Sequence, residues 1–185
     1  MATKQHQPLP PSRAQKVHDM DPHIDQLLRP PDLQPSRPNL TIVFGPAGGG
    51  KSTYVAQHAK PGDTIIDLDA IRAQLEISES DWSAAAMIRS LGVRNTRLRE
   101  LATSDAPGAW FIVSAAASSE REWWRNVLQP SAHFVVLASV GVCTNRIIKT
   151  RRGDRMERSL LAAKSWWSQF VQARDDALVT TDCGH

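Results

Sequence analysis

The stretch Gly45-Pro46-Ala47-Gly48-Gly49-Gly50-Lys51-Ser52 decides the fold of this 185-residue chain. It matches G-x-x-x-x-G-K-[ST], the pattern of a phosphate-binding loop. The apolar residues 39–44 before it are typical of a short strand, and residues 52–59 after it have the pattern of a helix. Glycines let the backbone bend around an anion with its amides pointing inward, and the helix start adds a positive end. An accidental Lys-Ser after a glycine-rich turn is the alternative, and the order of strand, loop and helix argues against it.

A nucleoside triphosphate is the ligand that this loop predicts. Lys51 can reach the β- and γ-phosphates, and the Ser52 hydroxyl can ligate Mg²⁺. The candidate nucleotide-binding residues are the loop itself and the first residues of the helix: Gly45, Pro46, Ala47, Gly48, Gly49, Gly50, Lys51, Ser52 and Thr53.

The composition indicates one domain with a substantial core, because 41% of the residues are hydrophobic. No run of about 18 apolar residues and no apolar signal region is present, so we expect a cytoplasmic protein with no membrane partner. Cys143 and Cys183 lie far apart without metal-ligand spacing, which favours two reduced thiols. The net charge of +3 permits binding to a polyanion without establishing it.

Residues 1–38 are expected to form a flexible, proline-rich arm. Eight of the 12 prolines fall in this segment and interrupt any long helix. A short helix is expected around residues 25–28. The arm could dock onto the domain that follows or recruit a protein partner, and the sequence does not choose between the two.

Residues 39–185 are expected to form an α/β domain. Apolar runs alternate with helical patterns, and the continuous runs at 64–66 and 134–137 are typical of parallel strands covered on both faces. This alternation predicts a three-layer P-loop NTPase fold with a parallel sheet of about five strands and ligands beyond their carboxyl ends. The expected strands are 40–44, 64–67, 110–114, 133–138 and, more weakly, 178–180; the expected helices are 51–59, 69–77, 83–102, 119–128, 141–151 and 156–176.

Two tryptophan pairs stand out, Trp123-Trp124 and Trp166-Trp167. Adjacent residues on a helix point about 100° apart, so each pair is expected to span the boundary of the core. Packing onto the sheet is the favoured interpretation. A stacking platform for a nucleic-acid base is the alternative.

Asp69 and Arg72 follow the second expected strand and would share one face of a helix starting there. A carboxylate at that place can accept a proton from an attacking hydroxyl, and an arginine one turn away can hold an anionic group of the acceptor. The alternative is that Asp69 caps the helix and Arg72 is a solvated ion-pair partner.

A basic run after the fourth strand and its helix is the candidate lid. Small P-loop kinases carry at this place arginines that close over the donor and neutralise charge during phosphoryl transfer. Gly153 could act as the hinge. The lid candidates are Arg151, Arg152 and Arg155, with Arg146 ranked below them; an ordinary basic helix end is the alternative.

Taken together, the loop, Asp69-Ala70-Ile71-Arg72 and the arginine-rich lid resemble the bacteriophage-type polynucleotide 5′-hydroxyl kinases over about residues 40–175. The third strand, running through a small-residue turn into Ser118-Ser119-Glu120-Arg121, adds to the likeness. The resemblance implies that Asp69 is the general base on the 5′-OH and that Arg72 contacts the phosphate of the acceptor. It also implies that Lys51 and Ser52 bind ATP and Mg²⁺.

One departure from that family concerns the end of the third strand. Family members carry an aspartate where this chain reads Ser114-Ala115-Ala116-Ala117. Asp67 or Asp69 is then the nearest replacement toward Mg²⁺, and we take Asp67 with Ser52 as the metal candidates. The departure implies reduced activity or another acceptor.

Three functions follow from these patterns. The leading one is ATP-dependent transfer of the γ-phosphate to a hydroxyl, with a nucleic-acid 5′ end as acceptor. The second keeps the fold but phosphorylates a small metabolite or nucleotide sugar, as in the zeta-toxin-like kinases. The third is a slow ATPase that acts as a switch or assembly factor and recruits a partner through the arm.

The expected helix 83–102 carries Arg89, Arg94, Arg97 and Arg99. These cations could follow a nucleic-acid backbone. A solvated helix face is the favoured alternative.

Overall fold

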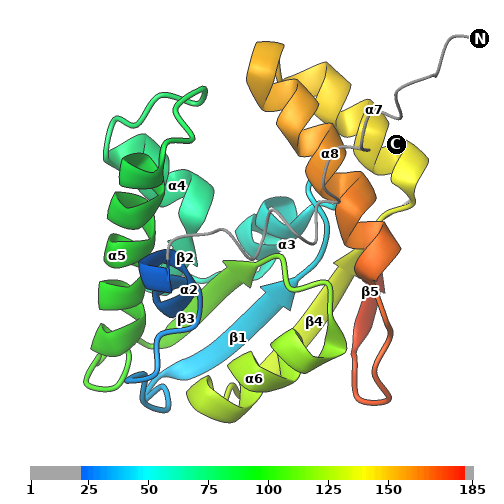
Figure 1. The fold of residues 1–185 in the computed structure, drawn as a ribbon. Coiled ribbons are helices and arrows are strands. Elements are labelled where there is room, and N and C mark those ends of the chain that lie inside the picture. Colours follow the sequence, from blue (N-terminus) through cyan, green and yellow to red (C-terminus); the bar gives the residue numbers. More distant parts are fainter. Residues whose placement is uncertain (1–21, 182–185) are drawn as a thin grey trace, which may run out of the picture.

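The computed structural model describes residues 22–181, which form one five-stranded sheet flanked by helices (Figure 1). The strand order is β2-β3-β1-β4-β5, and every neighbouring pair is parallel. The expected α/β fold with a parallel sheet of five strands is therefore confirmed. The strands are β1 (Asn39–Phe44), β2 (Thr64–Asp67), β3 (Gly108–Val113), β4 (Ala132–Leu137) and β5 (Leu178–Thr180).

The helices follow the expected order, with one clear difference in length. The last helix was expected to reach residue 176 but ends at Gln169, because Phe170 adopts an extended conformation and the chain beyond it binds a buried arginine. The helices are α2 (Pro22–Leu28), α3 (Lys51–His58), α4 (Leu68–Gln74), α5 (Ala84–Glu100), α6 (Ser118–Leu128), α7 (Val140–Thr150) and α8 (Gly153–Gln169).

Both faces of the sheet are covered, which explains why its strands read as continuous apolar runs. On one face, Leu40, Ile42 and Phe44 pack in the large core with residues of α5 and α6. On the other face, Val43 packs against Val55 of α3. β1 lies between β3 and β4, and Phe44 pairs with both Val113 and Val135, so these strands end close together. The phosphate loop begins at this edge.

The tryptophan pairs belong to the core, as the favoured interpretation predicted. Trp124 and Trp166 are buried, and Trp123 and Trp167 pack partly buried against the same cluster. The stacking-platform alternative therefore does not apply to these four side chains.

The described part of the proline-rich segment, residues 22–38, packs onto the domain. Ile24 and Leu33 are buried. Buried Arg94 and Asn95 of α5 donate hydrogen bonds to the Leu27 carbonyl at the end of α2, at 2.7 and 2.8 Å. Arg94 is thus committed to the fold and is unsuited to the nucleic-acid backbone. Residues 1–21 of the expected arm lie outside the described residues.

No helix within residues 22–181 combines the length and the apolar character needed to cross a membrane.

Candidate active site at the carboxyl edge of the sheet

The phosphate loop has backbone geometry that requires glycine. A Cβ on Gly45 would lie 2.3 Å from the Val136 carbonyl oxygen, and one on Gly48 would lie 2.7 Å from that of Cys143 in α7. Gly50 has a φ of 97° and caps α3 in the left-handed conformation. The loop is therefore wedged between β4, α7 and α3 at the place that the sequence predicts.

Lys51 lies folded over this loop. Its Nζ donates hydrogen bonds to the Gly45 and Pro46 carbonyls, both at 2.9 Å. Burial disfavours the charged ammonium and lowers the pKa of Lys51 to about 8, while Asp67 and Asp69 act in the opposite direction. The lysine is held at the loop, where a bound phosphate would further favour its charged form.

Ser52 and Asp67 form the candidate metal pair. The Ser52 hydroxyl donates to Asp67 Oδ2 at 3.0 Å. A hydroxyl and a carboxylate are the hard oxygen donors that suit Mg²⁺, which keeps several waters and uses few protein ligands. No cluster of three or more His, Cys, Asp or Glu side chains that could hold a metal occurs in the described part of the chain. The oxygen donors of Ser52 and Asp67 fit an Mg²⁺ ion that takes its other ligands from phosphates and water.

Asp67 also takes the capping role that the sequence left open for Asp69. Its Oδ1 accepts a hydrogen bond from the Asp69 amide at 3.0 Å, which makes Asp67 the N-cap of α4. The Asp69 carboxylate is 56% exposed and faces two arginines of the expected lid. Arg151 Nη2 lies 3.7 Å and Arg155 Nη2 3.8 Å from Asp69 Oδ2.

The remaining lid candidates lie elsewhere. Arg152 donates to the carbonyls of Ile148 and Arg151 at the end of α7, so it does not join Arg151 and Arg155 at Asp69. Arg146, ranked lower from the sequence, lies at the phosphate loop. It donates to the Thr181 carbonyl at 2.5 Å and approaches the Gly48 carbonyl at 3.4 Å.

A small pocket of about 50 Å³ opens beside Asp69. Arg72 is only 5% exposed, which excludes a solvated ion pair. Its Nη2 donates to the carbonyls of Ser78 and Asp81, whereas its Nη1 is buried without a hydrogen-bond partner. Such a group is rare in a protein interior and calls for a ligand or water. The pocket is lined by Asp69, Arg72, Ala73, Ile77, Glu79, Trp82 and Arg155.

A larger pocket of about 370 Å³ lies between α3 and Arg146 of α7. Its size and its place beside Gly50 suit the nucleoside part of a nucleotide whose phosphates occupy the loop. It is lined by Gly50, Thr53, Tyr54, Gln57, Arg146 and Thr181. The loop motif marked Gly50 and Thr53 in the sequence, and Arg146 was a lower-ranked lid candidate. No motif marked Tyr54, Gln57 or Thr181, because they join the loop only through the packing of α3 and the chain after β5.

Helix α8 bridges from the lid to the loop between α4 and α5. Arg155 pairs with Glu79, and Arg158 donates to the Ser80 carbonyl at 3.2 Å. Gly153, with a φ of 51°, is the first residue of α8, at the place where the sequence predicts a hinge. Figure 1 shows the α7–α8 pair on one side of α3 and the α4–α5 pair on the other. The pocket beside Asp69 is thus enclosed by contacts from both pairs.

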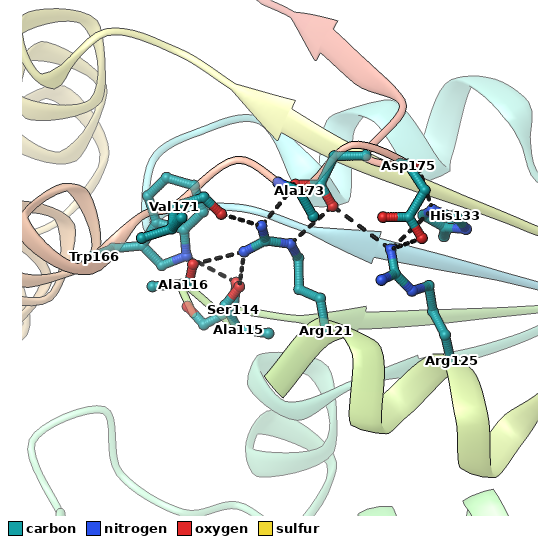
Figure 2. Close-up of polar contacts among 11 residues, drawn as sticks. Ser114, Ala115, Ala116, Arg121, Arg125, His133, Trp166, Val171, Ala173 and Asp175 are labelled. Carbon is teal, nitrogen blue, oxygen red and sulfur yellow. Dashed lines mark hydrogen bonds and ion pairs between the residues drawn. The ribbon is translucent and has the colours of Figure 1, made fainter. Parts of the chain in front are cut away.

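The turn after β3 is held by Arg121, as Figure 2 shows. Its fully buried guanidinium uses all of its N–H groups, on the Ala115, Ala116 and Val171 carbonyls and on both oxygens of Asp176. The Ser114 carbonyl accepts from the Gly45 amide at 3.2 Å and from Trp166 Nε1 at 2.8 Å. The turn therefore supports the start of the phosphate loop but contributes no carboxylate.

A comparison with models of protein families shows the family of this chain. The family model described as AAA domain matches residues 40–175. The chain belongs to this AAA domain family. The match extends from β1 past the end of α8 and includes the phosphate loop, Asp69, Arg72 and the lid arginines. No curated protein sequence matches this AAA domain protein.

Solved structures share the fold of this AAA domain. A sugar kinase from Janibacter sp. HTCC2649 is 19% identical, with a TM-score of 0.51 over 78% of this chain and 85% of that chain. TT1252 from Thermus thermophilus is 18% identical, with a TM-score of 0.51 over 79% and 90%. A chain of the Pnkp1/Rnl/Hen1 RNA repair complex is 14% identical, with a TM-score of 0.54 over 76% and 48%. At these identities the likenesses show a shared fold.

Proposed function

We propose that this protein transfers the γ-phosphoryl group of ATP to a hydroxyl group, and that the hydroxyl is the 5′-OH of a nucleic acid. The observation that carries the proposal is the position of Asp69. Its carboxylate lines the small pocket and lies within 4 Å of two lid arginines, while Asp67 takes over the helix cap. Asp69 can therefore accept a proton from a hydroxyl bound in the pocket while Arg151 and Arg155 lie next to its carboxylate.

In the proposed reaction, the Asp69 carboxylate accepts the proton of the acceptor hydroxyl. The hydroxyl oxygen forms a bond to the γ-phosphorus, and the bond from that phosphorus to the bridging oxygen of ADP breaks. Lys51, Arg151 and Arg155 neutralise the charge on the phosphoryl oxygens and keep water away. Mg²⁺, held by Ser52 and Asp67 when bound, would supply further charge neutralisation on the phosphates.

The charges around the pocket favour an acceptor that carries a phosphate. Arg72, Arg155 and Arg158 lie at or beside the pocket, and Arg72 Nη1 has no protein partner. Guanidinium groups bind phosphate oxygens strongly when they are buried. The internucleotide phosphate next to a 5′-OH would satisfy Arg72, whereas a neutral sugar would leave it unpaired.

A small-metabolite kinase is the second candidate, and the pocket volume of about 50 Å³ favours it. A pocket of that size admits only a small group unless the α4–α5 loop moves away from α8.

The test is incubation with γ-labelled ATP and separate pools of 5′-OH DNA, 5′-OH RNA and sugars or sugar acids. We expect label on the 5′ ends. Label on a sugar alone would overturn the nucleic-acid assignment, and label released only as inorganic phosphate would overturn phosphotransfer in favour of a slow ATPase.

A further inference from the structure

Trp82 is an exposed aromatic side chain fixed at the small pocket. Its side chain is 41% exposed, and it is the only aromatic among the exposed large apolar residues of the part of the chain described. The indole Nε1 donates to the Glu79 carbonyl at 2.9 Å, and Ser83, the next residue, caps α5. The ring is therefore held in place while much of its surface stays open to solvent.

The surroundings of the ring join it to the proposed acceptor site. The Arg72 guanidinium lies 4.4 Å from the ring centroid, well within the range of a cation–π contact. Arg158 of α8 lies at 5.7 Å, close to the outer limit of that range. Trp82 and Asp69 line the same pocket. A ligand that reaches Asp69 would pass the indole.

The tryptophans that the sequence offered as stacking platforms are packed in the core, which leaves Trp82 as the aromatic surface at this edge. We propose that Trp82 determines acceptor specificity by stacking on the base of the terminal nucleotide while Arg72 binds its phosphate. The inference rests on the proposed function and specifies that the protein recognises the terminal base of the acceptor. Every base has a π face, so such a contact accepts all four bases and rejects an acceptor that has none.

The experiment compares two 5′-OH oligonucleotides that differ only in the terminal nucleotide, which carries a base in one and is abasic in the other. Both keep the neighbouring phosphate. For the wild type we expect kcat/KM to be on the order of tenfold higher for the acceptor with the base. Trp82→Leu should remove this preference, and Trp82→Phe, which keeps a π face, should retain it. Thermal unfolding and ATP affinity check that each variant is folded.

The two acceptors separate stacking from a merely structural role. If Trp82 only supported Arg72, its loss would weaken both acceptors equally, since both carry the phosphate, and that result would overturn the inference. A wild type that phosphorylates both acceptors equally would overturn it without any variant. Transfer to neither acceptor would contradict the proposed function itself, and the inference would fall with it.

Discussion

The backbone amide of Asp69 donates a hydrogen bond to Asp67 Oδ1 at 3.0 Å. The carboxylates of Asp67 and Asp69 thereby make different contacts. Asp67 caps α4 and accepts a hydrogen bond from the Ser52 hydroxyl, whereas the Asp69 carboxylate lines the small pocket and faces Arg151 and Arg155. This division is what the proposed chemistry requires, because a carboxylate engaged as a cap or metal ligand is less available as a base.

Lys51 makes ATP binding depend on pH. Burial lowers its pKa to about 8, so the ammonium is charged below this pH and loses its proton as the pH rises through it. Bound phosphates favour the charged form and raise the pKa again. We therefore expect ATP affinity to fall between pH 7 and pH 9, roughly the range around that pKa, with proton uptake on binding in calorimetry. Lys51→Arg keeps its charge over this range, so its affinity should lose this pH dependence; a wild type with constant affinity would contradict the assignment.

Gly48→Ala should damage the phosphate loop. The new Cβ would lie 2.7 Å from the Cys143 carbonyl oxygen at a φ of 73°. Overpacking costs about 1–3 kcal/mol, so we expect roughly tenfold weaker ATP binding or more. The matched control is Gly92→Ala in α5, where nothing lies within 4 Å of the new Cβ. It should raise the free energy of unfolding by about 0.5–1 kcal/mol. Equal ATP affinities in the two variants would refute the steric argument.

Arg121→Ala should destabilise the fold strongly. It removes the guanidinium that binds both oxygens of the buried Asp176 carboxylate and leaves only Arg125, 3.6 Å from Oδ1, which costs about 3–5 kcal/mol of the free energy of unfolding. The control is Arg37→Ala, which breaks an exposed pair with Asp105 and should cost less than about 1 kcal/mol. Denaturant unfolding measures the free energy of unfolding of both variants. Similar losses in the two would contradict the expectation that the buried pair stabilises the fold more than the exposed one.

The same pair predicts a loss of stability in acid. Burial alone would raise the pKa of Asp176, but hydrogen bonds from Arg121 and from the Ala173 amide outweigh it, so the pKa is lowered below 3.8. Its contribution is therefore present above the unfolded-state pKa and is lost as the pH falls through the lower folded-state value. In Asp176→Asn, the free energy of unfolding should fall less steeply as the pH is lowered. An unchanged pH dependence would contradict the assignment of the acid loss to Asp176.

The phosphate loop and the strands were predictable because their causes are local. Gly45, Gly50 and Lys51 follow a fixed spacing, and strands buried on both faces read as apolar runs. The lid arginines were harder, since Arg146 and Arg152 lie in the same basic run as Arg151 but point to different partners.

The features missed in the sequence depend on distant partners. The pattern of α8 continues past Gln169, but the Val171 carbonyl is taken by Arg121, 50 residues earlier in the chain. For the proline-rich segment the sequence left docking onto the domain open, and in its described part the Leu27 carbonyl accepts a hydrogen bond from Arg94, 67 residues later in the chain. Trp82 stands in a polar loop, with no periodic pattern to mark it.

The most direct test of the account is the rate of phosphoryl transfer by Asp69→Asn. We expect transfer to fall by about 10²-fold or more while calorimetry shows ATP binding retained. Asp105→Asn, which alters an exposed aspartate near α5, should leave the rate at the wild-type level. Wild-type transfer by Asp69→Asn would contradict the account, because the Asp69 carboxylate would then not be needed to activate the acceptor hydroxyl.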